Sequence, residues 1–224
     1  PPLADTSAEV LGAEAHYGSA AAAGSAREVD IKIAARHPSA AGVTVFLREM
    51  VGLALTAPPG LTGFAGARPK PMPVLRLFSF LLPKASVTVA VSIDGRRLDY
   101  EETGAPGTIA GAGAAALPLP AVEAGTGDLV HVPLESLAFG RSGDKGNRAN
   151  IGVLARHPDY LPWIAAALTE ERVSGVFAHF LAPEQPRPVE RFYLPGTAAL
   201  NFLLHDVLGG GGVASLRADP QGKV

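Results

Sequence analysis

A short polar segment, residues 141–152, carries most of the residue types in this chain that could bind or transform a small molecule. Its sequence is RSGDKGNRANIG, and it lies between two apolar, β-like runs. Its three glycines let the backbone approach a ligand closely, and polar loops on a rigid scaffold often carry function. The segment is therefore the first candidate site, and the competing interpretation is an ordinary polar turn between two strands.

Anion binding is the first chemistry that this segment suggests. Ser142, Gly143 and the amides after them could form a backbone nest, a concave row of N–H groups, to which Arg141 and Lys145 add positive charge. A carboxylate or a phosphate would fit such a nest. We therefore expect a pocket bordered by this segment, shared with the N-terminal part of the chain or with another subunit.

Proton transfer is the second chemistry. Asp144 and Lys145 are an adjacent acid and base in a glycine setting, which makes them the candidate catalytic pair if the protein is an enzyme; a structural salt bridge is the alternative. Asn147 and Asn150 would either orient a substrate carbonyl or hold the turn through backbone hydrogen bonds.

Several familiar sites are disfavoured. The segment lacks the GK[ST] of a phosphate-binding P-loop and the GxSxG of a nucleophile elbow. Ser142 and Lys145 have the spacing of serine–lysine hydrolases, but Gly143 and Gly146 argue against the helix that such a pair needs. There is no cysteine and no HxH or HExxH pattern, and His205 alone suggests a helix end, so we expect no metal site. The sequence specifies no cofactor.

The N-terminal part should supply a sheet with one helix on it. Residues 1–26 lack a sustained period and predict a loose arm or a short helix, whereas 28–35 alternate as a strand does. A helix is predicted from Val43, capped by Ser39 and ended by the prolines at 58–59. Two further strands, 74–83 and 86–94, the second closed by an Asp94-Gly95 turn, should join the 28–35 strand in one sheet.

The C-terminal part should be a second domain. Residues 103–127 are rich in Ala, Gly and Pro, which is typical of a linker. Beyond it Asp159 and Thr169 are expected to start helices, with Pro162 in a first turn. Four glycines at 209–212 indicate close backbone approach to another element, a ligand or a subunit. The predicted elements are strands at 128–140, 151–156, 189–195 and 212–217, helices at 159–169, 169–181 and 199–208, and a turn at 219–222.

Several of these stretches resemble one known family. RSGDKGNRANIGVLAR, LTEERV and RFYLPGTAALNFLLHDVLGGGGVASLR are similar to the C-terminal ferredoxin-like domain of the acyclic terpene utilisation family AtuA, over about 129–223. Upstream, VLRLFSFLLPKASVTVAVSIDG looks like the end of that family's core domain, over about 28–94. The resemblance implies an α+β chain of two domains: 1–102 as part of the core domain, 103–127 as linker, and 128–224 as a ferredoxin-like α/β sandwich.

The resemblance also implies a bacterial, cytoplasmic protein that acts in the breakdown of branched or terpenoid acyl compounds. Two functions remain open: hydratase or lyase chemistry on a carboxylate or acyl-CoA, or a non-catalytic binding or assembly module. Whether the chain is an enzyme, and on which substrate, is left undecided by its residues. Arg141, Ser142, Gly143, Asn147 and Asn150 are the expected ligand-binding residues.

The amino-acid composition disfavours some classes of binding partner. The 224 residues are 47 % apolar and carry a net charge of −2 without a basic run, which disfavours nucleic acid. No apolar stretch reaches the about 18 residues of a membrane span, and the absence of cysteine fits a reducing cytoplasm. We expect a small-molecule ligand and a homo-oligomer. The first residue is Pro1, so the chain looks like a fragment that lacks an N-terminal portion.

Overall fold

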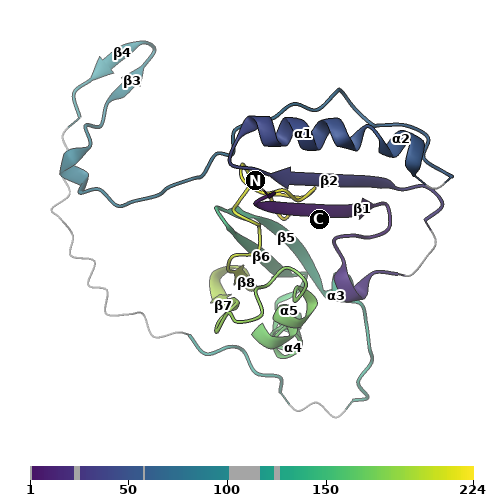
Figure 1. Ribbon diagram of the computed structural model, residues 1–224. Coiled ribbons are helices and arrows are strands. Elements are labelled where there is room, and N and C mark those ends of the chain that lie inside the picture. The colour runs from purple at the N-terminus through teal and green to yellow at the C-terminus, as the bar shows by residue number, and fades with distance from the viewer. Residues whose placement is uncertain (1, 23–25, 58, 101–116, 124–126) are drawn as a thin grey trace. The chain divides into compact units, whose positions relative to one another are not determined.

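The computed structural model describes residues 2–22, 26–57, 59–100, 117–123 and 127–224 (Figure 1). The chain divides into two compact units, of which one combines Pro1–Leu77 with Leu119–Val224 and the other is Phe78–Pro118. Most of the predicted linker, 103–116 and 124–126, lies outside the described residues. The domain boundaries at 102 and 128 therefore stay a prediction.

The N-terminal part begins with a two-stranded antiparallel sheet. β1 (Asp5–Leu11) pairs with β2 (Asp30–Arg36), so that Glu9 faces Lys32 across the ladder. The strand predicted at 28–35 is confirmed, but the loose arm predicted for residues 1–26 is wrong. β1 mixes small, charged and apolar residues, and its strand character depends on its pairing with β2.

The predicted capped helix is confirmed as α1 (Ala40–Met50), which a single turn, α2 (Leu53–Thr56), follows. The Ser39 hydroxyl accepts a hydrogen bond from the Gly42 amide at 3.3 Å, which satisfies one of the unpaired N–H groups of the first turn. The chain leaves helical geometry at Ala57, before the proline-rich run begins.

The predicted strand at 74–83 is wrong, because the described residues between 57 and 83 carry no helix or strand. A short hairpin of β3 (Val91–Ile93) and β4 (Arg96–Leu98) follows. Its turn is the predicted Asp94-Gly95 pair, with φ angles of 50° and 76°. β3 and β4 form a sheet of their own, so the expectation that this region shares a sheet with β2 is also wrong.

The C-terminal part is built on four strands: β5 (Ala138–Lys145), β6 (Arg148–Ala155), β7 (Val189–Leu194) and β8 (Ala199–Leu204). They form an antiparallel sheet with the order β5-β6-β8-β7. β5 starts at Ala138, later than predicted, because a helical turn, α3 (Leu134–Leu137), precedes it. The predicted strand at 189–195 is confirmed.

The helix predicted at 199–208 is wrong, because residues 199–204 form strand β8 between β6 and β7. Leu200, Phe202 and Leu204 are at most 2 % exposed and alternate with Asn201 and Leu203. Apolar side chains at every second position are the pattern of a strand, although a short apolar run also fits a helix. Residues 199–204 form a strand because they pair with β6 on one side and with β7 on the other.

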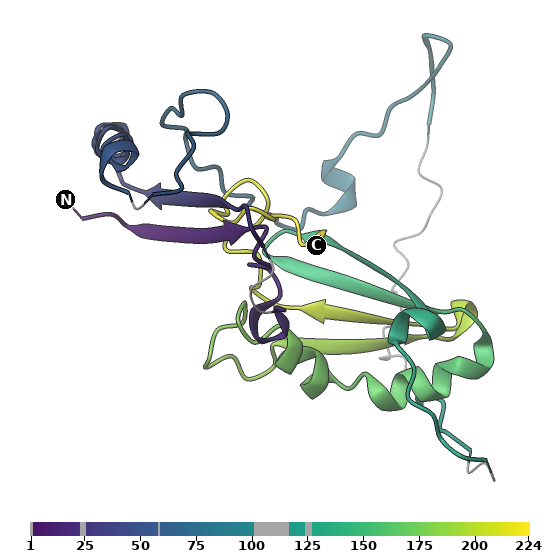
Figure 2. The ribbon, with the colours of Figure 1, turned by 90° about the vertical axis from the view of Figure 1, so that its right-hand side faces the viewer.

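Two short helices cover one face of this sheet (Figure 2). The helices predicted in this region are confirmed as α4 (Leu161–Ala167) and α5 (Glu170–Val176). As predicted, Pro162 lies in the first turn of α4 and Thr169 caps α5. The predicted Asp159 cap is wrong, since the His157 ring accepts the Asp159 amide ahead of the single turn Pro158–Tyr160.

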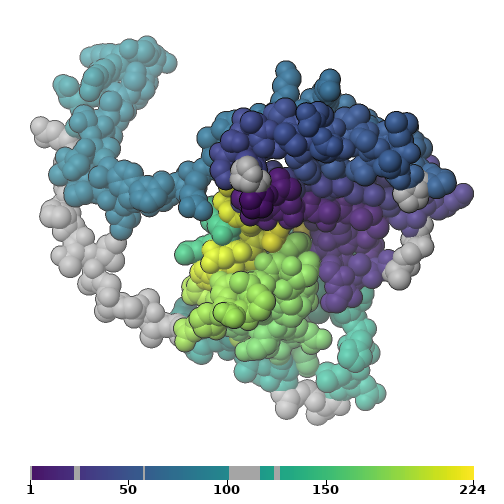
Figure 3. All heavy atoms as spheres, in the orientation of Figure 1, coloured from purple at the N-terminus to yellow at the C-terminus, as the bar shows by residue number. Residues whose placement is uncertain are grey.

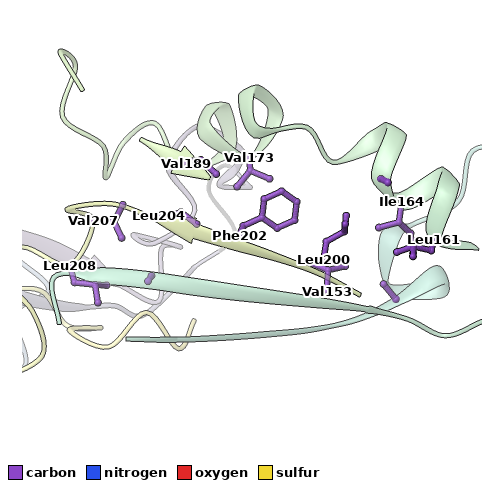
Figure 4. Packing of buried hydrophobic residues seen from close by; sticks show 13 residues of the cluster. Val153, Leu161, Ile164, Val173, Val189, Leu200, Phe202, Leu204, Val207 and Leu208 are labelled. Carbon is purple, nitrogen blue, oxygen red and sulfur yellow. The ribbon is translucent and has the colours of Figure 1, made fainter. Parts of the chain in front are cut away.

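The core lies between these helices and the sheet (Figure 4). Leu161 and Ile164 of α4 lie over one end of the sheet, near Leu200, and Val173 of α5 lies near Phe202 and Val189. Burying each such side chain contributes about 1.5–3 kcal/mol, so the core holds the sheet and helices together.

The chain ends in a run of turns. Residues 205–224 contain no strand, so the strand predicted at 212–217 is wrong. The predicted turn at 219–222 is confirmed, because the Asp219 carboxylate accepts the amides of Gln221, Lys223 and Val224. In Figure 3 this yellow segment borders the green residues of the helical region.

Candidate functional site

The glycine-rich segment 141–152 forms a β-hairpin. Ser142 and Gly143 are paired with Ile151 and Asn150, so the predicted backbone nest is wrong: these amides belong to extended strands. Only Gly146 takes a positive φ, 68°, at the turn between Lys145 and Arg148. Gly146 therefore serves the tight turn of the hairpin.

Strand alternation divides the predicted site residues between two faces of the sheet. Ser142 pairs with Ile151 of β6, and Asp144 pairs with Ala149. Both therefore lie on the sheet face that α4 and α5 cover. Arg141, Gly143, Lys145 and Asn150 belong to the other face, and Asn147 lies in the turn.

A cavity of about 580 Å³ adjoins the hairpin. The sequence predicts a pocket here, and Arg141 and Ser142 do line it. The apolar part of its wall consists of Ala149, Ile151, Phe177, Phe180, Leu204, Val207, Leu208 and the aliphatic part of Val224. The polar and charged part consists of His16, Arg141, Ser142, Arg217, Asp219 and Lys223. The cavity thus joins a hydrocarbon wall to several cationic groups, the combination that an apolar anion requires.

Arg217 is the most enclosed of these cations. Its Nη1 donates to the Val207 carbonyl, and its guanidinium carbon lies 4.5 Å from the centre of the Phe180 ring. Burial lowers the pKa of the Arg217 guanidinium from its ordinary value, while the Glu9 carboxylate opposes that shift. Arg217 was missed by the sequence interpretation, which assigned it to a strand; the cations that flank the 219–222 turn are the signal that could have found it.

The candidate catalytic pair is separated in the structure. The Asp144 carboxylate lies 3.9 Å from Lys223 Nζ, and Lys223 lines the cavity. Lys145 is exposed and donates from Nζ to the Asp144 carbonyl at 2.9 Å. Asp144 can therefore act on the cavity through Lys223, whereas Lys145 lies apart from it.

The two asparagines bridge different segments. Asn147 donates to the Asp206 carboxylate at 3.0 Å and accepts the Gly210 amide at 2.7 Å. Asn150 donates to the Asn201 side chain at 3.2 Å. Both hold strands and turns together, and in each case the partner is another segment and not the turn's own backbone.

The four-glycine run packs against the hairpin turn. A Cβ on Gly211, which has a φ of 91°, would lie 2.8 Å from the Gly146 carbonyl oxygen. The predicted close backbone approach is confirmed, and its partner is the hairpin. His205, expected at a helix end, directly follows β8 instead, and its Nε2 lies 2.5 Å from the Glu190 carboxylate.

The described part of the chain contains no group of three or more His, Cys, Asp or Glu side chains that could hold one metal ion. Among the same residues, no helix combines the length and apolar character needed to cross a membrane.

Comparison with protein families gave two matches. Residues 2–93 match the model of the acyclic terpene utilisation family protein AtuA, and residues 132–224 match the AtuA ferredoxin-like domain. No curated protein and no solved structure matches the chain. The second match corresponds to the part of the chain that holds the four-stranded sheet, its two helices and most of the cavity wall.

Proposed function

Because the chain belongs to the acyclic terpene utilisation family AtuA, we propose that it acts in the breakdown of branched or terpenoid acyl compounds in the bacterial cytoplasm. We place the acyl group in the cavity beside β5 and β6. The observation that carries this proposal is the composition of the cavity wall: an apolar surface from β6, β8 and the helical region adjoins Arg217 and Lys223.

A branched acyl group and its carboxylate would use the two parts of the wall differently. Phe177, Phe180 and Ile151 would contact the hydrocarbon, and Arg217 and Lys223 would pair with the carboxylate or thioester oxygen. The volume lies within the about 300–1,000 Å³ that is usual for small-molecule sites.

Ligand-dependent thermal melting tests the proposed binding. Branched unsaturated acids and their CoA thioesters should raise the melting temperature, since a ligand at a hundred times its Kd stabilises the folded state by about 2.7 kcal/mol. Straight-chain short acids should do so less. Lys223→Met should weaken binding about tenfold or more, whereas Arg148→Met, an exposed cation on β6, should leave it unchanged. A chain that none of these compounds stabilises would contradict the proposal.

For the chemistry we propose hydratase or lyase-type proton transfer, with Asp144 and Lys145 as the sequence-derived catalytic candidates and Arg141, Ser142, Gly143, Asn147 and Asn150 as ligand-binding candidates. Asp144→Asn and Lys145→Met should then abolish turnover of the stabilising ligand while the fold is kept. Asp144 contacts Lys223, which lines the cavity, so a loss of turnover in Asp144→Asn alone would assign the effect to this contact. Turnover that both variants retain would rule the pair out.

One observation favours a second function, assembly of copies of this chain. The sheet face opposite α4 and α5 carries Phe139, Leu154, Phe192 and Leu194, which are 43–53 % exposed. A cluster of exposed apolar side chains of this kind is typical of an interaction surface. The cavity favours the first proposal because it unites apolar and cationic residues in one concave site.

A further inference from the structure

We infer that His16 and Glu9 form a second candidate proton-transfer pair, one that faces the cavity from the N-terminal part of the chain. The inference rests on the proposed function, because it assigns chemistry to the same cavity. His16 lines the cavity, its side chain is 18 % exposed, and its Nδ1 lies 4.0 Å from Glu9 Oε1. Sequence reasoning passed over both residues, since they stand in a stretch that it assigned to a loose arm.

The Glu9 carboxylate is held so that its two oxygens have different partners. Oε2 accepts the Ala218 amide at 2.6 Å and lies 3.9 Å from Lys32 Nζ. Lys32 in turn donates to the Leu216 carbonyl at 2.9 Å. Oε1 is the oxygen that faces His16, and the Glu9 side chain is only 12 % exposed. A carboxylate fixed in this way favours the protonated form of the nearby imidazole and leaves the second ring nitrogen for substrate.

The segment that carries His16 is also held in place. The His16 carbonyl lies 3.0 Å from His179 Nε2, and a Cβ on Gly18 would overlap the His179 ring. Gly18 has a φ of 54°, which favours glycine there. The position of His16 at the cavity is therefore held by the contacts of its own carbonyl and of Gly18 with His179.

The charged and titratable groups that surround this pair come from several elements. They are Lys32 of β2, His179 after α5, and Arg217, Asp219 and Lys223 of the C-terminal segment. Most of these groups are cations, so the cavity favours negative charge that develops on a bound ligand.

The chemistry that fits this arrangement is the addition of water to an α,β-unsaturated acyl compound. Glu9 Oε1, 4.0 Å from His16 Nδ1, stabilises the positive charge that the ring gains when its other nitrogen takes a proton from water. The water oxygen bonds to Cβ while the double-bond electrons move to Cα and the carbonyl oxygen, where Arg217 or Lys223 stabilises the charge. The imidazolium then returns the proton to Cα, so one water is added across the double bond and no oxidant is needed.

The test uses dimethylacryloyl-CoA with the whole chain in D₂O, and it measures two quantities separately. Thermal melting reports binding. Mass spectrometry and NMR report the β-hydroxy product and deuterium at Cα. His16→Ala should lose the reaction by at least about a hundredfold with little change in binding, and added imidazole should restore part of it. Glu9→Gln should lower kcat more than it raises KM. His157→Ala, an exposed histidine outside the cavity wall, is the matched control and should retain the full rate.

The outcomes distinguish this inference from the proposal beneath it. If the chain binds the thioester but neither hydrates it nor exchanges its Cα proton, the proton-transfer inference is overturned and the binding proposal stands. A folded His16→Ala chain with the wild-type rate overturns the inference as well. If neither this thioester nor any other branched acyl compound stabilises the chain, the proposed function itself fails, and the assignment of His16 and Glu9 fails with it.

Discussion

A single arginine joins the two helices to the sheet. Arg191 of β7 is 12 % exposed and belongs to the helix-covered face, in register with Phe202. Its Nη1 donates to the carbonyls of Ala165 and Leu168 at 2.8 Å, and its Nε lies 3.1 Å from the Glu170 carboxylate. The carbonyls at the end of α4 lack partners within that helix, so Arg191 both satisfies them and contacts the start of α5.

Replacing this guanidinium should therefore loosen both helices. Arg191→Met should lower the free energy of unfolding by about 3 kcal/mol, because two charge-assisted hydrogen bonds are lost and the carbonyls remain partly buried. Arg191→Lys should lose less of the free energy of unfolding than Arg191→Met but more than none, since an ammonium cannot replace the planar guanidinium and its several N–H donors. Urea denaturation followed by circular dichroism measures both changes, and a Met variant with the wild-type midpoint would disprove this role.

At the scale of elements, the helices of the C-terminal part are short and depend on their ends. α5 has seven residues, so it cannot be stable without its cap and its packing. The Thr169 hydroxyl accepts the Arg172 amide at 3.2 Å, and two glutamates occupy the first turn. The pKa of Glu171 is lowered because its own backbone amide and the Thr169 side chain donate to it, with a smaller effect of Arg191.

The Thr169 cap can be tested by itself. Thr169→Ala should lower the free energy of unfolding by about 1 kcal/mol, because an N–H group of the first turn loses its partner. Thr169→Ser keeps the hydroxyl and serves as the control, with a midpoint close to that of the wild type. The measurement is equilibrium urea unfolding at neutral pH. Equal midpoints for the Ala and Ser variants would show that the cap contributes nothing measurable.

At the scale of the whole molecule, exposed apolar side chains on the sheet face opposite α4 and α5 offer a surface through which copies of the chain could associate. Phe139, Leu154, Phe192 and Leu194 project from that face, and the Arg156 guanidinium lies 3.7 Å from the centre of the Phe139 ring. A second copy could cover these side chains with the same residues of its own, as two-fold interfaces do.

We expect the chain to form a homo-oligomer through this face. Phe192→Glu should convert it to monomers, because a charge would then have to be buried at the centre of an apolar contact. Sedimentation equilibrium over a range of concentrations measures the change. Glu184→Lys, an exposed charge beyond α5, is the control and should leave association unaltered. A wild-type chain that stays monomeric at the highest concentration would contradict the expectation.

The elements that the sequence predicts correctly are those decided by neighbouring residues. The Ser39 and Thr169 caps, the Asp94-Gly95 turn and the strand at 30–36 all depend on contacts or periodicity within a few positions. The α+β class and the family follow from the same stretches of sequence. These features are local, so no knowledge of the partner segment is needed to find them.

Tertiary structure alone decided the rest. Residues 199–204 carry an apolar run that fits a helix or a strand, and their place between β6 and β7 made them a strand. Strand pairing assigned Arg141 and Ser142 to opposite faces of the sheet. The cavity unites His16 with Arg217, and Glu9 meets Ala218 across 209 positions of the chain. Such contacts form because folding brings distant segments together, and a pattern within one short segment cannot encode its partner.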